Sequence, residues 1–173
     1  MSRPVVPART HGFTLVEVLI VVVMMGILSA LAVDTGLREL RRERVNAVTV
    51  NLAGWLETVR RASLRGTSCT ATINTGAMTA GATLATADSS GCLEDAPLTI
   101  DSDAGGMSFS VTSSASSVTF TPRGTRHPSD DDVTISVSLA PAGPSRCILI
   151  KGLLGVIGLG KSDGSTCIPD QRF

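Results

Sequence analysis

The polar and apolar residues of this chain fall into three successive patterns. The first is an apolar run of 20 residues from Thr14 to Val33, which contains a single carboxylate, Glu17. At 1.5 Å per residue, a helix of this length spans the roughly 30 Å hydrocarbon core of a bilayer. An acid within such a span costs about 2.5–3.5 kcal/mol on insertion scales, so Glu17 is a candidate functional group.

The second pattern, over residues 37–64, is helical and amphipathic. Its apolar residues recur every three or four positions and form one stripe: Val45, Val48, Leu52, Trp55, Val59 and Ala62. The single tryptophan of this stripe is expected to anchor the core. Because no proline interrupts the segment, one helix is predicted over about 13–65, ended by Gly66 and Thr67.

Beyond Gly66 the period of the pattern changes to two. Alternation is clear in Met107–Val111 and Val133–Leu139, and Gly, Pro, Asp and Ser separate the segments. The predicted strands are 70–75, 82–87, 98–101, 107–112, 117–121, 133–139, 147–151 and 154–158. The three patterns together predict an α+β fold, in which one long N-terminal helix packs its stripe against an antiparallel β-sheet head.

The formal net charge is zero, but the charges are unevenly distributed. Residues 67–173 carry six basic and ten acidic residues, a net charge of −4, which argues against a general nucleic-acid-binding surface. Residues 34–66 carry seven arginines against four acids. The arginines at 38–44 directly follow the apolar run, which departs from the positive-inside rule if the N-terminus is cytoplasmic.

All four cysteines lie beyond the apolar run, at Cys69, Cys92, Cys147 and Cys167. If that run crosses a membrane, they face the oxidising side, where an even count favours disulfides. Three pairings are possible, and the two local ones, 69–92 with 147–167, are preferred. Four buried thiols remain the alternative. A zinc site is disfavoured because no C-x-x-C spacing occurs, so no metal and no cofactor are expected.

Three other motifs are weighed against simpler interpretations. Residues 155–162 fit the P-loop pattern G-x-x-x-x-G-K-[ST], but no helical pattern follows, so a turn between strands is predicted instead. The acidic run 130–132 lacks EF-hand spacing and is predicted to be a solvated turn. His127 has no catalytic partner at a recognisable spacing, and His11 is a bystander near the N-terminus. No enzymatic activity is expected.

The stretch Gly12-Phe13-Thr14-Leu15-Val16-Glu17, followed by the apolar run, resembles the prepilin signature of type IV pilins and type II secretion pseudopilins. The resemblance implies that a membrane peptidase cleaves after Gly12 and methylates the new N-terminal Phe13. It also implies that Glu17, the fifth mature residue, serves in assembly. The implied partners are the prepilin peptidase and methylase, and other pilins or pseudopilins in a helical filament.

The resemblance also implies how the chain is divided. Residues 1–12 are a cytoplasmic leader, and residues 13–33 are the transmembrane half of one long helix. Residues 34–66 are the amphipathic half of the same helix, and residues 67–173 form a β-rich head. The protein is then placed in the inner (cytoplasmic) membrane, with the head on the outer, periplasmic side. An ordinary secretory signal cleaved after Ala32 is the alternative; Glu17 inside the apolar run weighs against it.

A second resemblance concerns the head. Residues 120–125 (Phe-Thr-Pro-Arg-Gly-Thr) and 146–152 are similar to the F-x-P-x-G turn and the later strand ending in glycine of GspH/FimT-like minor pseudopilins and pilins. Members of that group implicated in DNA uptake carry a Gly-Arg-x-Arg segment, whereas residues 152–155 here contain no arginine.

Two classes of function follow, with a single-span anchor protein that never polymerises as the third alternative. The first is a structural minor subunit of a secretion pseudopilus or type IV pilus. The second is a pilin-like binding module that captures DNA or a secreted substrate at a filament tip, with Arg123, Arg126 and Arg146 as candidate contacts.

Overall fold

A computed structural model of the chain describes residues 12–88, 91–92, 97–101, 106–127, 131–140, 143–162 and 166–169. Residues 1–11 of the predicted leader, which include His11, lie outside these ranges. Asp130, the first residue of the acidic run, lies outside them as well. The chain divides into two compact units, Met1–Glu39 and Leu40–Phe173. The second unit, called the head below, contains residues 40–63 of the helix and all of the strands described.

The long helix predicted from the sequence is present. Helix α1 runs from Leu15 to Ser63, 49 residues without a break. Its last turn carries Arg60 and Arg61, which interact favourably with the partial negative charge at a helix C-terminus. The chain then turns at residues 64–67, where Gly66 adopts a positive φ of 107°.

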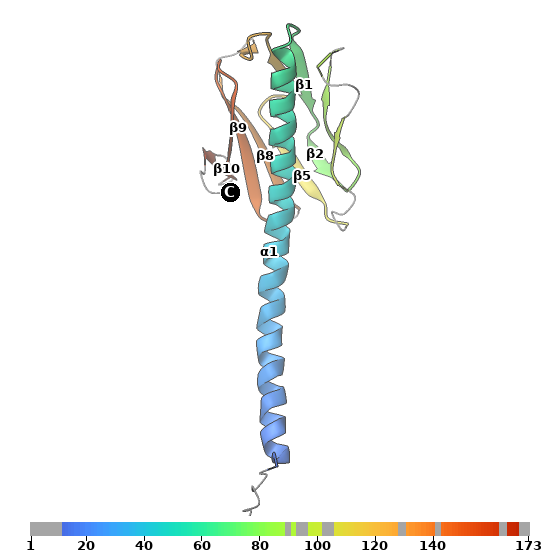
Figure 1. Cartoon of the computed structure of the whole chain (residues 1–173), viewed down its shortest axis with the longest axis vertical. Helices are drawn as coiled ribbons and strands as arrows, with labels where there is room; N and C mark the ends of the chain where they lie inside the picture. The colour runs from blue at the N-terminus through green and yellow to red at the C-terminus, as the bar shows by residue number, and fades with distance from the viewer. Residues whose placement is uncertain are drawn as a thin grey trace, which may run out of the picture. The chain divides into compact units, whose positions relative to one another are not determined.

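The antiparallel strands predicted for the head are present and form two sheets (Figure 1). The five-stranded sheet has the order β4-β3-β1-β6-β7, and the six-stranded sheet the order β11-β10-β9-β8-β5-β2. The strands are β1 Cys69–Ile73, β2 Gly76–Met78, β3 Thr83–Ala87, β4 Leu98–Thr99, β5 Phe109–Ser113, β6 Ser117–Phe120, β7 Arg126–His127, β8 Val133–Leu139, β9 Ser145–Lys151, β10 Val156–Ser162 and β11 Cys167–Pro169.

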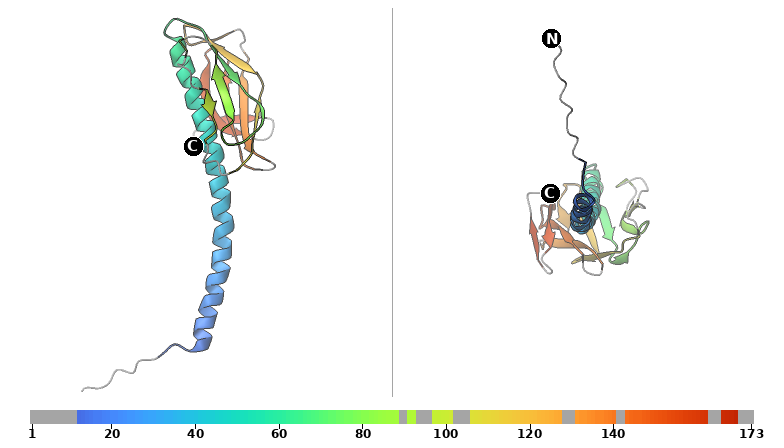
Figure 2. Two further views of the ribbon diagram at one scale, coloured as in Figure 1. Left: turned by 90° about the vertical axis from the view of Figure 1, so that its right-hand side faces the viewer. Right: turned by 90° about the horizontal axis from the view of Figure 1, so that it is seen from below.

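One hydrophobic core lies between the head's part of α1 and both sheets. In Figure 2 residues 40–63 of α1 lie along one side of the strands. The core joins Leu52 and Leu56 of the helix to Phe120 of the five-stranded sheet and to Ile135 and Ile148 of the six-stranded sheet. The alternating burial of β8, with every second residue from Val133 buried, is what one face packed on this core requires.

At the centre of the head's helix, the buried stripe lies one residue further along the chain than the predicted stripe. Val45, Leu52 and Val59 are fully buried as predicted, but Leu56 is fully buried whereas Trp55 and Val48 are only half-buried. Trp55 therefore lies at the margin of the core and is not its central anchor. The prediction followed apolar residues alone, and two polar residues complete the buried stripe.

Those two residues are Thr49 and Ser63, both with no exposed surface. Thr49 Oγ1 donates a hydrogen bond to the carbonyl of Val45 at 2.7 Å, and Ser63 Oγ donates one to the carbonyl of Arg60 at 2.7 Å. A buried hydroxyl costs stability only when it lacks a partner. The helix backbone itself satisfies both side chains, so they can occupy core positions.

The predicted strands match the observed ones in place, with shifts at their ends, and three short strands were missed. The missed strands are β2, β7 and β11, two or three residues each, too short to show alternation. The strand predicted at 154–158 begins instead at Val156, and residues 152–155 form a turn.

The predicted turn at 155–162 was wrong. Residues 156–162 form β10, which pairs with β9 along its length and with β11 at its end. Gly160 permits the second pairing, because a Cβ there would lie 2.3 Å from the carbonyl oxygen of Ile168. A regular strand lacks the loop into a helix N-terminus that a phosphate-binding P-loop needs, and the glycines of this motif serve sheet packing.

The cysteines form the two local disulfides, Cys69–Cys92 and Cys147–Cys167. The first joins the start of β1 to the segment between β3 and β4. The second joins β9 to β11 and thereby fixes the last strand described to the six-stranded sheet. Each bridge closes a loop of about twenty residues, the kind of covalent restraint expected in an extracytoplasmic domain.

Candidate assembly site at the start of the long helix

The start of α1 is defined by Thr14, which is the N-cap residue. Its carbonyl accepts hydrogen bonds from the N–H groups of Glu17 at 3.1 Å and Val18 at 3.3 Å. Its hydroxyl oxygen accepts a further bond, at 3.3 Å, from the same N–H of Glu17. A side-chain acceptor at this position satisfies one of the N–H groups that have no partner within the helix. The helix start is therefore determined locally.

Gly12 and Phe13 precede this cap and are exposed. The bond between them, the predicted cleavage point, thus lies outside hydrogen-bonded secondary structure. Phe13 is 83% exposed, the highest value among the large apolar side chains of the described residues. The structure therefore brings the predicted cleavage point, the cap and Glu17 together at one helix end.

Glu17 lies in the first turn of α1. With Thr14 it completes the spacing Thr-x-x-Glu of a capping box, a signal present in the sequence that the prediction did not use. An acid at this position interacts favourably with the partial positive charge of the helix N-terminus. This local interaction shows why an acid is tolerated at the helix start, but it leaves the carboxylate exposed among apolar residues.

The apolar run that follows is exposed wherever the structure describes its side chains. All described side chains from Phe13 to Ala30 are exposed, and α1 contains a segment long and apolar enough to cross a membrane. Its polar residue Ser29 donates a hydrogen bond to the carbonyl of Met25 at 2.7 Å, so its hydroxyl needs no outside partner. A surface of this kind requires lipid or neighbouring helices to cover it.

A comparison with protein families matches this same stretch. Residues 7–33 match a family model described as "Prokaryotic N-terminal methylation motif". Searches of curated proteins and of solved structures gave no match. The chain therefore carries a type IV pilin-like prepilin motif, and its fold, one long helix with antiparallel sheets, is the pilin-like α+β architecture.

This motif supports a type IV pilin-like or pseudopilin precursor as the class of protein. The matched residues contain Gly12, Phe13 and Glu17 and end at the last residue of the apolar run. The motif implies processing by a prepilin peptidase and assembly with pilin-family subunits. The apolar helix that follows is consistent with anchoring in a membrane.

The three arginines considered as a DNA-binding surface do not form one. Arg126 is only 4% exposed, and its guanidinium donates hydrogen bonds to the carbonyls of Ile150 and Asp131. Arg146 is half-buried and its Nε donates to Oδ1 of Asn46 at 2.6 Å, which ties β9 to α1. Of the three, only Arg123 is exposed. The first two have structural roles that the sequence pattern did not reveal.

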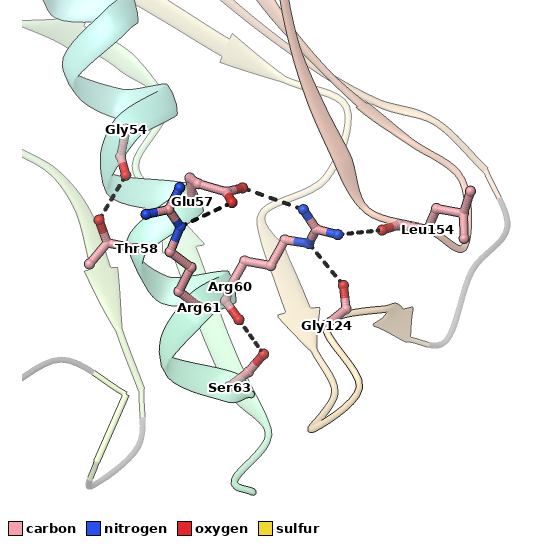
Figure 3. A network of polar contacts seen from close by, with 8 residues as sticks. All are labelled: Gly54, Glu57, Thr58, Arg60, Arg61, Ser63, Gly124 and Leu154. Atoms are coloured by element: carbon pink, nitrogen blue, oxygen red, sulfur yellow. Dashed lines mark hydrogen bonds and ion pairs between the residues drawn. The ribbon is translucent and has the colours of Figure 1, made fainter. Parts of the chain in front are cut away.

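A polar network at the end of α1 was also missed (Figure 3). Arg60 donates from Nε to the carbonyl of Gly124 at 2.9 Å and from its NH2 group to the carbonyl of Leu154 at 3.3 Å. Glu57 lies within 3.5 Å of Arg60 and 3.3 Å of Arg61. Arg60 thus connects the helix to two turns, residues 121–125 and 152–155, which lie 64 and 94 residues away in the chain.

The acidic run and the histidine have ordinary positions where they are described. Asp132 accepts a hydrogen bond from the N–H of Gly152 at 2.8 Å and so holds the turn between β9 and β10. The carbonyl of Asp131 accepts from Arg126. His127 is exposed on β7. These contacts give the run a structural role in the head.

Proposed function

We propose that this protein is a non-enzymatic minor subunit of a type II secretion pseudopilus or a type IV pilus. The observation that carries the proposal is the methylation motif at residues 7–33, placed on a capped helix whose following apolar surface is covered by none of the described residues. Cleavage after Gly12 and methylation of Phe13 would produce the mature subunit. Its helix would then leave the bilayer to pack among the helices of other subunits.

Glu17 is the residue proposed to direct assembly. Its carboxylate lies about one helical turn from the amine that cleavage creates at Phe13, so each mature subunit carries one anion and one cation at the same end. An unpaired carboxylate in hydrocarbon is costly, and pairing it with the amine of a neighbouring subunit removes that cost. Pairing of this kind favours one axial register between neighbouring helices.

The finer assignment, to GspH/FimT-like minor subunits, is supported by the geometry of the head. The Phe120–Thr125 segment ends β6 and forms a turn in which Gly124 has a positive φ of 73°. The 146–152 segment belongs to β9 and ends in the turn at Gly152. The two segments end close together, since the N–H of Arg126, directly after the first, donates to the carbonyl of Leu153, directly after the second, at 2.8 Å. The proposed location is the inner membrane, with the head on the periplasmic side.

The alternative, a binding module at the tip of a filament, has less support than the structural role. A DNA-capturing surface would have to rely on Arg123 alone among the three arginines considered, because Arg126 and Arg146 are engaged inside the head. Capture of a secreted substrate by the head is compatible with the same membrane anchor and the same processing. Either function would be additional to filament assembly.

Two measurements test the proposal. Mass spectrometry of the protein from its host should find a mature chain that begins with N-methylated Phe13. A chain that keeps residues 1–12, or one cut after Ala32, would overturn it. For assembly, Glu17→Ala should leave cleavage intact and reduce incorporation into filaments at least tenfold.

The matched control is Glu43→Ala, which removes an exposed carboxylate of the same helix outside the apolar run. This variant should assemble like the wild type. If both variants assembled normally, the charge-pairing role of Glu17 would be wrong while the processing result could still stand.

A further inference from the structure

The end of the head where α1 terminates exposes a group of aliphatic side chains. This group, called the pole patch below, consists of Leu64, Leu153, Leu154 and Val156, with exposed fractions of 56, 55, 67 and 47%. Leu64 follows the last turn of α1, and the other three lie at or beside the turn between β9 and β10. Aliphatic side chains exposed to this extent and gathered in one place are uncommon unless they bind something.

The members of the pole patch are brought together by the network shown in Figure 3. Arg60 links the helix end to the carbonyls of both Gly124 and Leu154. A Cβ placed on Gly124 would lie 3.0 Å from Leu64 Cδ2, so this leucine packs directly on the Gly124 turn. The carbonyl of Leu153 accepts from the N–H of Arg126, which belongs to the strand that follows that turn.

The turn that presents the two central leucines is firmly held. The N–H of Gly152 donates to Asp132 at 2.8 Å, and the N–H of Gly155 donates to the carbonyl of Lys151 at 3.0 Å. Between these two bonds along the turn, the carbonyl of Leu154 accepts from Arg60 and the carbonyl of Leu153 accepts from the N–H of Arg126. The leucine side chains point away from this framework, since more than half of each is exposed. Because the turn is already held in place, little conformational entropy is lost when these leucines bind.

Three cations and one carboxylate, that of Asp132, lie beside the pole patch. Arg65 follows Leu64, Arg123 precedes Gly124, and Lys151 is the cross-strand neighbour of Val156. All three are exposed. The head as a whole, residues 40–173, carries 12 basic and 12 acidic residues and hence no net charge, so this basic margin is a local feature.

We propose that the pole patch binds the surface of a membrane that contains anionic phospholipids. Leucines on a protruding turn enter the boundary between headgroups and acyl chains, and the surrounding cations contact phosphate groups. Protein interfaces instead depend on tryptophan, tyrosine and arginine seated in pockets, and the patch contains no aromatic residue. The membrane engaged in this way is bound by the head, independently of the bilayer that holds α1.

The test uses the full-length protein in nanodiscs of phosphatidylcholine, which occupy α1 and leave the head accessible. These nanodiscs are mixed with vesicles of phosphatidylcholine, with or without phosphatidylglycerol, and binding is measured by flotation. Binding should require phosphatidylglycerol. Leu153→Ser/Leu154→Ser should weaken it at least tenfold, because about 0.8 kcal/mol is lost per CH₂ group no longer buried.

Arg65→Gln/Arg123→Gln should weaken it about tenfold or more, at roughly fivefold per charge. Two variants serve as controls and should bind like the wild type: Ile168→Ser, which changes an aliphatic residue of similar exposure on β11, and Arg41→Gln, which removes an exposed arginine at the other end of the head's helix. Thermal unfolding of each variant checks that the head remains folded.

Absence of binding to anionic vesicles would overturn the proposal, as would binding that the leucine variant does not weaken. Duplex DNA is the competing probe. If the protein bound DNA, and the arginine variant abolished that binding while the leucine variant preserved it, the patch would be a nucleic-acid site and the lipid proposal would be wrong.

Discussion

The two halves of α1 share one backbone but bury their apolar residues in different ways. Residues 15–30 expose every side chain, whereas between residues 45 and 63 one face of the helix is buried beneath two sheets. In the first half the apolar residues surround the helix, as lipid or neighbouring helices require. In the second half the buried apolar residues form one stripe, and the exposed face is mostly polar, although Val50 there is 43% exposed. The comparison shows that hydrophobicity in one helix can serve two different environments.

The largest effect expected from this comparison is on the stability of the head. Leu52→Ala should destabilise the head by about 2–5 kcal/mol, because Leu52 is fully buried in the core. Leu19→Ala makes the same change on the exposed half and should leave head unfolding unchanged. Chemical denaturation of both variants, followed by the fluorescence of Trp55, measures the difference. Equal effects would mean that the two halves are not independent.

The disulfides should affect the head alone as well. Replacing Cys69 and Cys92 by serine should lower the free energy of unfolding by about 3 kcal/mol, the amount expected for a loop of this length. The measurement is denaturation of the variant beside the wild type, with and without reductant. A wild type that reductant does not destabilise would contradict the prediction.

A smaller effect is expected at the end of α1. Arg60→Met keeps much of the aliphatic stem but removes the donors to Gly124 and Leu154, and should cost about 1–2 kcal/mol. Arg61→Met is the matched control, because the Arg61 side chain is 75% exposed and Figure 3 shows it paired with Glu57 alone. Amide hydrogen exchange at Gly155 should accelerate in the first variant only.

The smallest effect concerns the first turn of the exposed half. Thr14→Ala removes the capping hydroxyl and should destabilise that turn by about 1 kcal/mol, while Thr14→Ser should preserve it. Hydrogen exchange at the amide of Glu17 in detergent micelles reports the cap directly. Unchanged exchange in the alanine variant would show that the carbonyl of Thr14 suffices to hold the turn.

Much of the architecture could be predicted because it follows from local periodicity. The apolar run, the unbroken helix and the strand at 133–139 each show a regular period in the sequence. The strand at 156–162 was predicted only in part, at 154–158, because its glycines resemble a turn when the partner strands are unknown. Gly160 is explained only by the approach of β11.

The functional residues also differ in whether a local pattern in the sequence reveals them. Gly12, Phe13 and Glu17 are recognisable from a motif within six residues, and the family match covers the same stretch. The capping box at Thr14 was equally visible but was not used. The Arg60 network and the burial of Arg126 depend on residues up to 94 positions away, which no local pattern indicates.

The sequence by itself therefore determined the prepilin motif, the long helix, the β-rich head and its separation from the apolar run. These are properties of neighbouring residues, because helix period, strand alternation and hydrophobic length all act over short distances. The tertiary structure decided the division into two sheets, the central line of the buried stripe and the structural use of two arginines. It also created the pole patch, since only packing brings Leu64 beside Gly124 and lets Arg60 join that turn to Leu154.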